Sequence, residues 1–349
     1  MSRDDIETPA VVVDADRLER NLTRWQDHCD QHGLANRPHV KTHRCVEIAQ
    51  RQLELGAVGI TCQKLSEAEV MADAGCDDIL VPYNIVGPAK LRRLRALLER
   101  TAVTVSVDDA ALLLGLAGAA RGASHELGVL VDCDTGLGRT GVPTPEAAVE
   151  LAVDVVSRDD LRFDGFLTYP APEGAEPFLA AAVAGADGRG LAATVVSAGG
   201  TPSMWRSGEL RPTVTEYRVG NYAFYDRTSV AAGAASLDDV ALTVQATVVS
   251  RPAPDRAILD AGSKALTSDL GPDPGHGLLL EAPSSIIERL SEEHAYVALA
   301  EDDDLELGQR VRIVPNHACV VVNLYDELAI MRDDVVEASW RVAARGHSL

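Results

Sequence analysis

The segment Arg37-Pro38-His39-Val40-Lys41-Thr42-His43 contains the first of eight short apolar runs that have the pattern of β-strands. Stretches with helical spacing, such as Cys45–Leu55 and Pro88–Arg100, lie between most of these runs. Eight strand-plus-helix units between residues 37 and 222 predict an α/β fold, a (β/α)8 barrel of the TIM type. The predicted strands are Arg37–Lys41, Val58–Cys62, Ile79–Pro82, Val103–Val107, Leu127–Asp132, Phe163–Tyr169, Thr194–Ala198 and Glu216–Tyr222.

An open, doubly wound sheet is the alternative arrangement of such units. That fold is expected to carry a glycine-rich turn after its first strand. Here the first predicted strand runs into Lys41-Thr42-His43, which contains no glycine. The barrel is therefore favoured over the open sheet.

The pattern changes after about residue 233, where strand-like runs follow one another without a long helix between them. These runs are Val240–Ser250, Ala257–Asp260, Glu293–Leu299, Gln309–Val314 and Cys319–Tyr325. We therefore predict a separate, mostly antiparallel β domain over residues 233–349, and a barrel over residues 20–232. Residues 1–19 are predicted to be an N-terminal segment whose strand, Ala10–Val13, joins the β domain.

The composition argues against several classes of protein. The chain has 349 residues and a formal net charge of −21, whereas nucleic acid and anionic lipid both select a basic face. No apolar run reaches the ~18–20 residues of a membrane span, and the polar N-terminus lacks the core of a signal peptide. The six cysteines include no Cys-x-x-Cys pair, which excludes a zinc ribbon or a thioredoxin motif. We expect a cytoplasmic protein that binds neither nucleic acid nor membrane.

Lys41 stands at the end of the first predicted strand, and barrels of this type hold their active sites at the carboxyl ends of the strands. The chain has only four lysines, and this one is flanked by Arg37, His39 and His43. A lysine that is desolvated or flanked by positive charge is suited to forming a Schiff base. The alternative is a solvated lysine in a loop.

Glycine-rich turns follow the last two predicted strands of the barrel. They are Gly199-Gly200-Thr201 and Gly220-Asn221. Barrels often bind phosphate there through backbone N–H groups that only glycine lets approach closely, although tight turns alone also explain such glycines. A Schiff-base lysine and a phosphate cradle in one barrel mouth together indicate pyridoxal phosphate (PLP).

The segment Pro315-Asn316-His317-Ala318-Cys319 is a candidate metal site. On an extended strand, His317 and Cys319 would present both side chains on one face. Imidazole and thiolate suit Zn²⁺, and two ligands leave positions open for water or substrate, as a catalytic metal needs. A buried or chance His-x-Cys is the alternative.

These motifs together resemble the D-threonine aldolase and D-serine dehydratase family, PLP enzymes of the alanine-racemase-like (type III) fold. The resemblance covers nearly the whole chain. It rests on Thr8-Pro9-Ala10, Arg37 to His43, Gly59 to Lys64, Gly138-Arg139-Thr140-Gly141, Gly199-Gly200-Thr201-Pro202, Thr215 to Tyr222, Asp260 to Ala265 and Pro315 to Cys319.

The resemblance implies roles for individual residues. Lys41 and Tyr169 would be catalytic, and Arg139 would face the pyridine nitrogen of the cofactor. His317 and Cys319 would bind a divalent metal, with zinc preferred over manganese or magnesium. The residues implied to contact PLP are Lys41, His39, Gln63, Arg139, Tyr169, Gly199, Gly200, Thr201, Gly220, Asn221 and Tyr222.

The resemblance also implies a lyase that acts on D-3-hydroxy amino acids, by one of two routes. In β-elimination, Lys41 removes the Cα proton, hydroxide leaves, and a keto acid and ammonia result. In retro-aldol cleavage, the hydroxyl proton is removed, and glycine and an aldehyde result. Many family members carry Tyr-x-Gly-His where this chain has Tyr169-Pro170-Ala171-Pro172, so a candidate base for the hydroxyl proton is missing. His-x-Cys also resembles the dehydratase branch, and we therefore favour elimination.

Three further possibilities are open. An amino-acid racemase of the same fold needs a second base and no metal. A non-enzymatic PLP carrier of this fold typically lacks the additional β domain. A structural or interaction protein would show no absorbance from a bound cofactor. Related proteins are commonly dimers, so the resemblance implies a homodimer.

Overall fold

The computed structural model describes residues 2–172 and 174–349, and the chain forms two compact units. Unit 2 comprises Trp25–Lys41, Ile48–Gly220 and Gly346–Leu349. Unit 1 comprises the described residues up to Arg24, together with Thr42–Glu47 and Asn221–Arg345. These bounds differ from the predicted ranges, because the first helix is divided between the units and residues 221–232 belong to unit 1.

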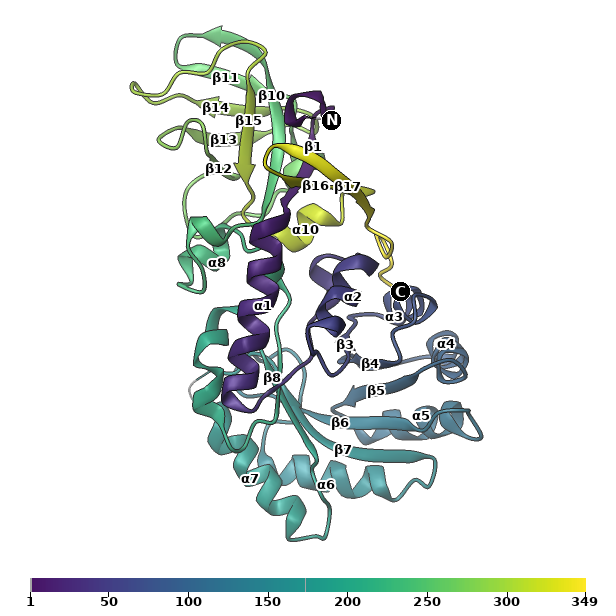
Figure 1. Cartoon of the computed structure of the whole chain (residues 1–349). Helices are drawn as coiled ribbons and strands as arrows, with labels where there is room; N and C mark the ends of the chain where they lie inside the picture. The colour runs from purple at the N-terminus through teal and green to yellow at the C-terminus, as the bar shows by residue number, and fades with distance from the viewer. Residues whose placement is uncertain (1, 173) are drawn as a thin grey trace. The chain divides into compact units, whose positions relative to one another are not determined.

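Unit 2 is built on eight parallel strands in the order β2-β9-β8-β7-β6-β5-β4-β3 (Figure 1). A parallel bridge between His39 and Thr61 joins the two ends of this order, so the sheet curls into a barrel. The predicted α/β barrel is confirmed. The strands are β2 (Ala35–Asn36), β3 (Ile60–Thr61), β4 (Asp78–Val81), β5 (Ala102–Val107), β6 (Leu127–Cys133), β7 (Leu161–Thr168), β8 (Val195–Gly199) and β9 (Glu216–Arg218).

Helices follow most of the barrel strands and cover the outer face of the sheet (Figure 1). Helix α6 shows why they form: Thr144 accepts the Ala147 N–H at 3.2 Å as N-cap, and Pro145 occupies the first position. The helices of this unit are α3 (Leu65–Asp73), α4 (Pro88–Leu98), α5 (Leu113–Ala120), α6 (Pro145–Val156) and α7 (Ala175–Asp187), with 3-10 turns η3 (Ala110–Leu112) and η4 (Thr201–Leu210). Helices α1 (Ala15–His32) and α2 (Val46–Glu54), and the turn η2 (Val40–Thr42), pass from one unit to the other.

The barrel is held together by apolar packing and by ion pairs near the amino ends of its strands. Leu80, Leu130 and Leu167, from three strands, form one buried cluster. The Arg37 guanidinium meets Glu216, the first residue of β9, at 2.5 Å and Asp78, the first residue of β4, at 2.7 Å. Contacts at the amino ends of the strands contribute to stability rather than to chemistry in a barrel of this kind.

Unit 1 contains a nine-stranded sheet with the main order β13-β14-β11-β10-β1-β16-β17 (Figure 1). Only the pair β1–β16 is parallel among the described strand pairs of this sheet, which confirms the mostly antiparallel domain. The strands are β1 (Ala10–Asp14), β10 (Leu242–Ala253), β11 (Arg256–Leu259), β12 (Leu278–Leu279), β13 (Ile286–Leu290), β14 (Ala295–Ala298), β15 (Arg310–Val314), β16 (Glu327–Arg332) and β17 (Val335–Arg341). The short helices are α8 (Arg227–Ala231), α9 (Ser263–Leu266) and α10 (Ala318–Val322), with 3-10 turns η1 (Arg3–Asp5), η5 (Asn221–Ala223) and η6 (Leu237–Asp239).

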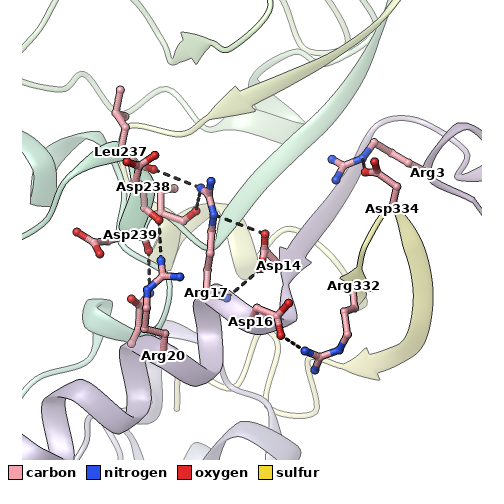
Figure 2. Close-up of polar contacts among 12 residues, drawn as sticks. Arg3, Asp14, Asp16, Arg17, Arg20, Leu237, Asp238, Asp239, Arg332 and Asp334 are labelled. Carbon is pink, nitrogen blue, oxygen red and sulfur yellow. Dashed lines mark hydrogen bonds and ion pairs between the residues drawn. The ribbon is translucent and has the colours of Figure 1, made fainter.

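The first turns of α1 are tied to unit 1 by arginines (Figure 2). Arg17 donates to the Val240 carbonyl at 2.9 Å, and Arg20 donates to the Asp238 carbonyl at 2.7 Å. Carbonyls at the end of a helical turn lack internal partners, and cationic side chains satisfy them. Arg332 pairs with Asp16 on the same helix. These contacts explain why the first part of α1 belongs to the β unit.

The predicted strand Cys319–Tyr325 is wrong, because Ala318–Val322 forms helix α10. The run of valines favours a strand locally. However, the Asp226 carboxylate accepts the Ala318 N–H at 2.9 Å, and Ala318, Val321 and Val322 are buried at helical spacing. Strands β12, β13, β16 and β17 were not predicted. None of the helices in residues 2–172 and 174–349 has both the length and the apolar character of a membrane span.

Candidate active site

The mouth of the barrel, at the carboxyl ends of the strands, brings several predicted residues of unit 2 together. Tyr169 directly follows β7, and its ring is the centre of the group. The Lys41 Nζ lies 6.0 Å and the Arg139 Cζ 5.2 Å from the centroid of this ring. A Cβ built on Gly200 would stand 3.7 Å from the same ring. The side chain of Tyr169 is 39% exposed, so this group faces an open surface.

Lys41 was predicted to end a regular strand. It lies instead in the 3-10 turn η2. The residue before this turn, His39, is buried at 8% exposure and bridges to Thr61. The 3-10 turn follows directly, so the lysine leaves the barrel wall at its mouth. Lys41 is half-buried.

His39 is a neutral neighbour of Lys41. Its Nε2 lies 3.0 Å from Gln63 Oε1, which can only accept, so Nε2 carries the proton. The other ring nitrogen, Nδ1, accepts the Lys41 backbone N–H at 3.5 Å. Burial, followed by the charges of Lys41 and Arg218, lowers the pKa of His39 well below its ordinary value. His39 and Gln63 therefore fix the start of the η2 turn without adding charge.

Arg218 was missed by the sequence analysis, although it lies inside the barrel at 5% exposure. Its Nε donates to Ser197 Oγ at 2.8 Å, and its terminal NH2 donates to the Thr168 carbonyl at 2.7 Å. Burial, the largest influence, lowers the pKa of this guanidinium. Arg139 is exposed by contrast. An arginine at the carboxyl end of the last strand, two residues before Gly220, is the signal that could have identified it.

Asp132, at the carboxyl end of β6, is a second titratable group in the mouth. Its carboxylate accepts Thr140 Oγ1–H at 2.8 Å. Burial raises the pKa of Asp132 to about 6, and the opposing effects of the Thr140 hydrogen bond and the Arg218 charge are smaller. This carboxyl is therefore able to change its protonation near neutral pH.

The predicted phosphate residues Gly199, Gly200 and Thr201 form a turn that suits an anion, but the N–H group of Gly200 is already hydrogen-bonded. Gly200 has φ +130°, which favours glycine, and a Cβ on Gly199 would lie 2.5 Å from the Arg218 carbonyl. The Gly200 N–H already donates to that carbonyl at 3.1 Å. Thr201 then begins η4, whose N-terminus receives no side-chain cap. The turn therefore fits a phosphate through the N–H groups that follow Gly200, rather than through Gly200 itself.

Gly220 ends unit 2, whereas Asn221 and Tyr222 belong to unit 1. The Asn221 Nδ2 donates to Asp226 at 2.6 Å and to Ser229 at 2.8 Å, so its amide donors are already used. Tyr222 is buried at 1% exposure. A contribution of Asn221 to phosphate binding would thus come from its backbone.

The candidate metal residues lie at the start of α10 in unit 1. His317 is the extended residue before the helix, and Cys319 lies in its first turn, so the two do not share a strand face. A hydrogen bond to Cys319 is the largest influence that raises the pKa of His317 to about 9. Cys319 Sγ lies 3.2 Å from Thr42 Oγ1, and His317 Nδ1 lies 3.7 Å from Asp269 Oδ2.

The donor set of this pair fits a divalent metal with open positions. The imidazole of His317 and the thiol of Cys319 lie two positions apart, and they are nitrogen and sulfur ligands that Zn²⁺ prefers. Within residues 2–172 and 174–349, no group of three or more histidine, cysteine, aspartate or glutamate side chains is arranged to hold a metal. The protein would therefore supply two ligands, and water or substrate the others.

Comparison with known families gives two matches, which together cover most of the chain. Residues 13–228 match the family described as alanine racemase, N-terminal domain. Residues 241–331 match the family described as putative serine dehydratase domain. The boundary between the matches falls just before β10, the first strand of unit 1 after the barrel.

The relatives that match along most of the chain include two aldolases and one dehydratase. The D-threonine aldolase of Arthrobacter sp is 37% identical, covering 98% of this chain and 94% of that protein. The 3-hydroxy-D-aspartate aldolase of Paracoccus denitrificans is 36% identical, covering 99% and 94%. The D-threo-3-hydroxyaspartate dehydratase of Delftia sp. (strain HT23) is 34% identical, covering 90% and 91%.

The solved structures that are similar to this chain also include both an aldolase and a dehydratase. The D-threonine aldolase from Filomicrobium marinum has a TM-score of 0.89 and 34% identity, covering 99% of this chain and 98% of that one. A metal-free cysteine-to-alanine variant of D-threo-3-hydroxyaspartate dehydratase has a TM-score of 0.90 and 29% identity, covering 98% of each chain. A histidine-to-alanine variant of the same enzyme also matches, and its substituted position lies two residues before the cysteine.

Proposed function

The chain belongs to the D-threonine aldolase and D-serine dehydratase family of PLP-dependent lyases, and from this premise we propose the reaction that its own residues support. We propose that it removes water from D-3-hydroxy amino acids with the help of PLP and a divalent metal. The products are a 2-oxo acid and ammonia. The observation that carries this proposal is the Lys41 amine, which stands 6.0 Å from the Tyr169 ring in the barrel mouth.

Lys41 is proposed to hold the cofactor covalently and to move the substrate proton. Bound PLP supplies an aldehyde for an amine and a ring that accepts electrons from the substrate Cα. The Lys41 amine takes the Cα proton as general base, and its place in η2 limits its reach to the barrel mouth. Because neighbouring His39 is neutral, it adds no second positive charge beside this amine.

The other mouth residues are proposed to bind and orient. Tyr169 packs beside the cofactor, and the N–H groups after Gly200 hold its phosphate. Arg139 is the arginine proposed from the sequence to face the pyridine nitrogen. The burial of Arg218 and its contacts with Thr168 and Ser197 favour Arg218 for that position instead. Either arginine would keep this nitrogen unprotonated.

His317 and Cys319 are proposed to hold the divalent metal, with zinc as the preferred ion. Such a metal is a Lewis acid for the 3-hydroxyl group of the substrate. Two points support the pair. The two residues lie two positions apart at the start of α10 in unit 1, and a histidine and a cysteine at the same spacing were the substituted residues in the related dehydratase. The identity of the metal and the homodimer stay predictions.

Elimination is favoured over aldol cleavage by two features of the chain. The His-x-Cys spacing matches the substituted pair of the dehydratase, whose cysteine variant is metal-free. After Tyr169 the chain has Pro170-Ala171, so the histidine that many relatives place there is missing. Retro-aldol cleavage to glycine and an aldehyde is the second candidate, because the D-threonine aldolase of Arthrobacter sp is 37% identical.

Product analysis separates the two routes. The holoenzyme is incubated with D-serine and, separately, with D-threonine, and 2-oxo acid, ammonia and glycine are measured. We expect pyruvate from D-serine, with ammonia in equal amount and without glycine. Glycine as the main product would establish the aldol route instead, and racemised substrate without either product would overturn both.

Removal of the metal tests the second half of the proposal. Cys319→Ala is expected to lower bound zinc and to reduce turnover about 100-fold, while PLP absorbance is kept. Wild-type protein that is stripped with a chelator and given zinc again serves as the control and should recover. If the variant keeps full activity in the presence of chelator, the metal role of Cys319 is wrong.

A further inference from the structure

The short segment Thr42–Glu47 belongs to unit 1, whereas Lys41, the residue directly before it, belongs to unit 2. The other parts of unit 1 end at Arg24 or begin at Asn221, so they are distant in the sequence. The segment is therefore held in unit 1 by tertiary contacts. Its first side chain, Thr42, directly follows the proposed Schiff-base lysine.

The segment contacts both ends of helix α10, which carries Cys319 in its first turn. Thr42 Oγ1 lies 3.2 Å from Cys319 Sγ. At the other end of the helix, Arg44 Nη1 donates to Oδ1 of Asn323, the C-cap residue, at 2.6 Å. The Arg44 carbonyl in turn accepts the Ala344 N–H at 3.0 Å. Contacts at both ends of one short helix fix the segment against it.

The backbone of the segment also shows that its conformation is held in place. Arg44 has φ +51°, a region that residues other than glycine rarely adopt. Such a conformation is unfavourable and persists only where surrounding contacts hold it. His43 is fully buried, and its Nδ1 lies 3.2 Å from the Cys45 backbone nitrogen. The position of Thr42, immediately before these residues, is therefore fixed with them.

The main chain around the metal pair is held by other groups of unit 1. Asp226 accepts the Ala318 N–H at 2.9 Å. The side chain of buried Asn316 donates to two backbone carbonyls, at 2.9 and 3.0 Å. These contacts fix the backbone on both sides of His317. The Thr42 hydroxyl contacts the cysteine sulfur atom itself.

The direction of this hydrogen bond depends on the protonation of the sulfur. A thiol and a hydroxyl can each donate to the other, and the distance of 3.2 Å allows both directions. A metal binds the thiolate, which can only accept, so the Thr42 hydroxyl must then donate. A hydrogen bond to the charged form favours that form. Because Thr42 is only 1% exposed, the contact is shielded from water.

We propose that Thr42 is a positioning residue of the metal site, whose hydroxyl donates to the Cys319 thiolate and holds it for the divalent metal. The inference rests on the proposed function, in which His317 and Cys319 bind that metal. Loss of a donor behind a metal ligand typically lowers metal affinity about 10- to 100-fold. One peptide bond would then join the lysine that holds the cofactor to the residue that orients a metal ligand.

Two substitutions separate the hydroxyl of Thr42 from its packing. Thr42→Val keeps the shape and removes the hydroxyl, whereas Thr42→Ser keeps the hydroxyl and removes a methyl group. PLP-loaded protein is stripped of metal, and its Zn²⁺ affinity is measured by competition with a chromophoric chelator. We expect Thr42→Val to weaken zinc binding about 10-fold and Thr42→Ser to bind zinc as the wild type does. Unweakened binding by the valine variant, or weaker binding by the serine variant than by the valine variant, would overturn the proposal.

Co²⁺ gives a readout of the sulfur itself, because a cobalt-bound thiolate absorbs by charge transfer from sulfur to metal. A hydrogen bond stabilises the sulfur electrons, so its loss moves this absorption to longer wavelength. We expect that shift in Co²⁺-loaded Thr42→Val and none in Thr42→Ser. An unchanged absorption in Thr42→Val would show that the hydroxyl does not donate to the thiolate, and the proposal would be wrong.

Thr101→Val is the matched control. Thr101 is also buried, at 2% exposure, and its hydroxyl donates to the Cys76 carbonyl at 3.1 Å in unit 2. Zinc affinity and the cobalt absorption should stay as in the wild type, and an equal loss in this variant would contradict a specific role of Thr42. If Thr42→Val does not fold, Thr42→Ala takes its place, since it also lacks the hydroxyl.

Cys319→Ala separates this inference from the proposed function. If Cys319→Ala binds zinc as tightly as the wild type, the proposed metal role of Cys319 fails, and the role of Thr42 fails with it. If Cys319→Ala loses zinc while Thr42→Val keeps wild-type affinity, only the role of Thr42 fails.

Discussion

The two ends of the barrel in unit 2 use charge in opposite ways. At the amino ends of the strands, Arg37 is matched by Glu216 and Asp78, and Arg162 by Asp164 at 2.6 Å. At the carboxyl ends, Lys64 and Lys90 face the same tyrosine, and a buried Asp132 has a raised pKa. Opposite charges in contact stabilise the fold, whereas like charges and shifted pKa values point to groups that act on a bound molecule.

The comparison predicts that substitutions at the two ends change different quantities. At the amino end the free energy of unfolding should fall while the chemistry is retained. At the carboxyl end turnover, binding or pH dependence should change while the fold is retained.

The largest effect is expected for Lys41→Ala. Loss of the amine removes both the proposed cofactor bond and the base, so kcat should fall at least about 10³-fold. The absorbance of bound PLP near ~410–430 nm, expected of a protonated Schiff base, should vanish, and the melting temperature of the cofactor-free protein should stay close to that of the wild type. Turnover that survives the substitution would remove the distinction between the two ends.

Arg37→Ala is expected to act on stability. The substitution leaves the Glu216 carboxylate, with 4% of its side chain exposed, without its cation. A broken buried pair of this kind costs about 3 kcal/mol of unfolding free energy. Urea denaturation measures this, with Arg206→Ala as control, because its partner Glu209 is exposed and the loss should stay below about 0.5 kcal/mol. If kcat of the folded Arg37 variant falls as far as it does for Lys41→Ala, the division of roles is wrong.

A smaller effect is expected from Asp132, through pH. Burial raises the pKa of Asp132 to about 6. Between pH 4 and 6 this carboxyl is therefore protonated in the folded protein but ionised in the unfolded chain. Stability should therefore decrease as pH rises through this window, by up to roughly 3 kcal/mol, and remain lower above it. Asp132→Asn should remove this decrease when the urea midpoints of the cofactor-free protein are compared at pH 4, 5 and 7. A wild-type protein whose midpoint rises across the window would contradict the assignment.

Much of the barrel mouth was predictable because strand ends carry function in this fold. The apolar runs between Ile79 and Ala198 correctly predicted strands β4 to β8. Lys41, Tyr169 and Gly200 were identified because they stand at the ends of predicted strands. Arg218 was missed because a single arginine in a strand gives no periodic signal, and its importance comes from burial among Ser197 and Thr168. Lys64 and Lys90 were missed because their meeting at Tyr83 depends on the packing of two helices.

Unit 1, the β unit, was less predictable than the barrel. The valines of residues 320–322 favour a strand, but the carboxylate of Asp226, ninety-two residues earlier than Ala318, caps the segment as a helix. His317 and Cys319 were identified by type and spacing, whereas the geometry assumed for them was wrong. Local propensity cannot predict a hydrogen bond to a residue that only the tertiary fold brings near, such as Asp226.

The central claim is that Lys41 carries the cofactor, and one measurement tests it most directly. The holoenzyme is treated with borohydride, which fixes a Schiff base, and its peptides are mapped by mass spectrometry. We predict the pyridoxyl mass on the peptide that contains Lys41, and none on the peptides of Lys64, Lys90 or Lys264. A label on another lysine, or an unmodified Lys41 in protein that has been supplied with PLP, would contradict the account.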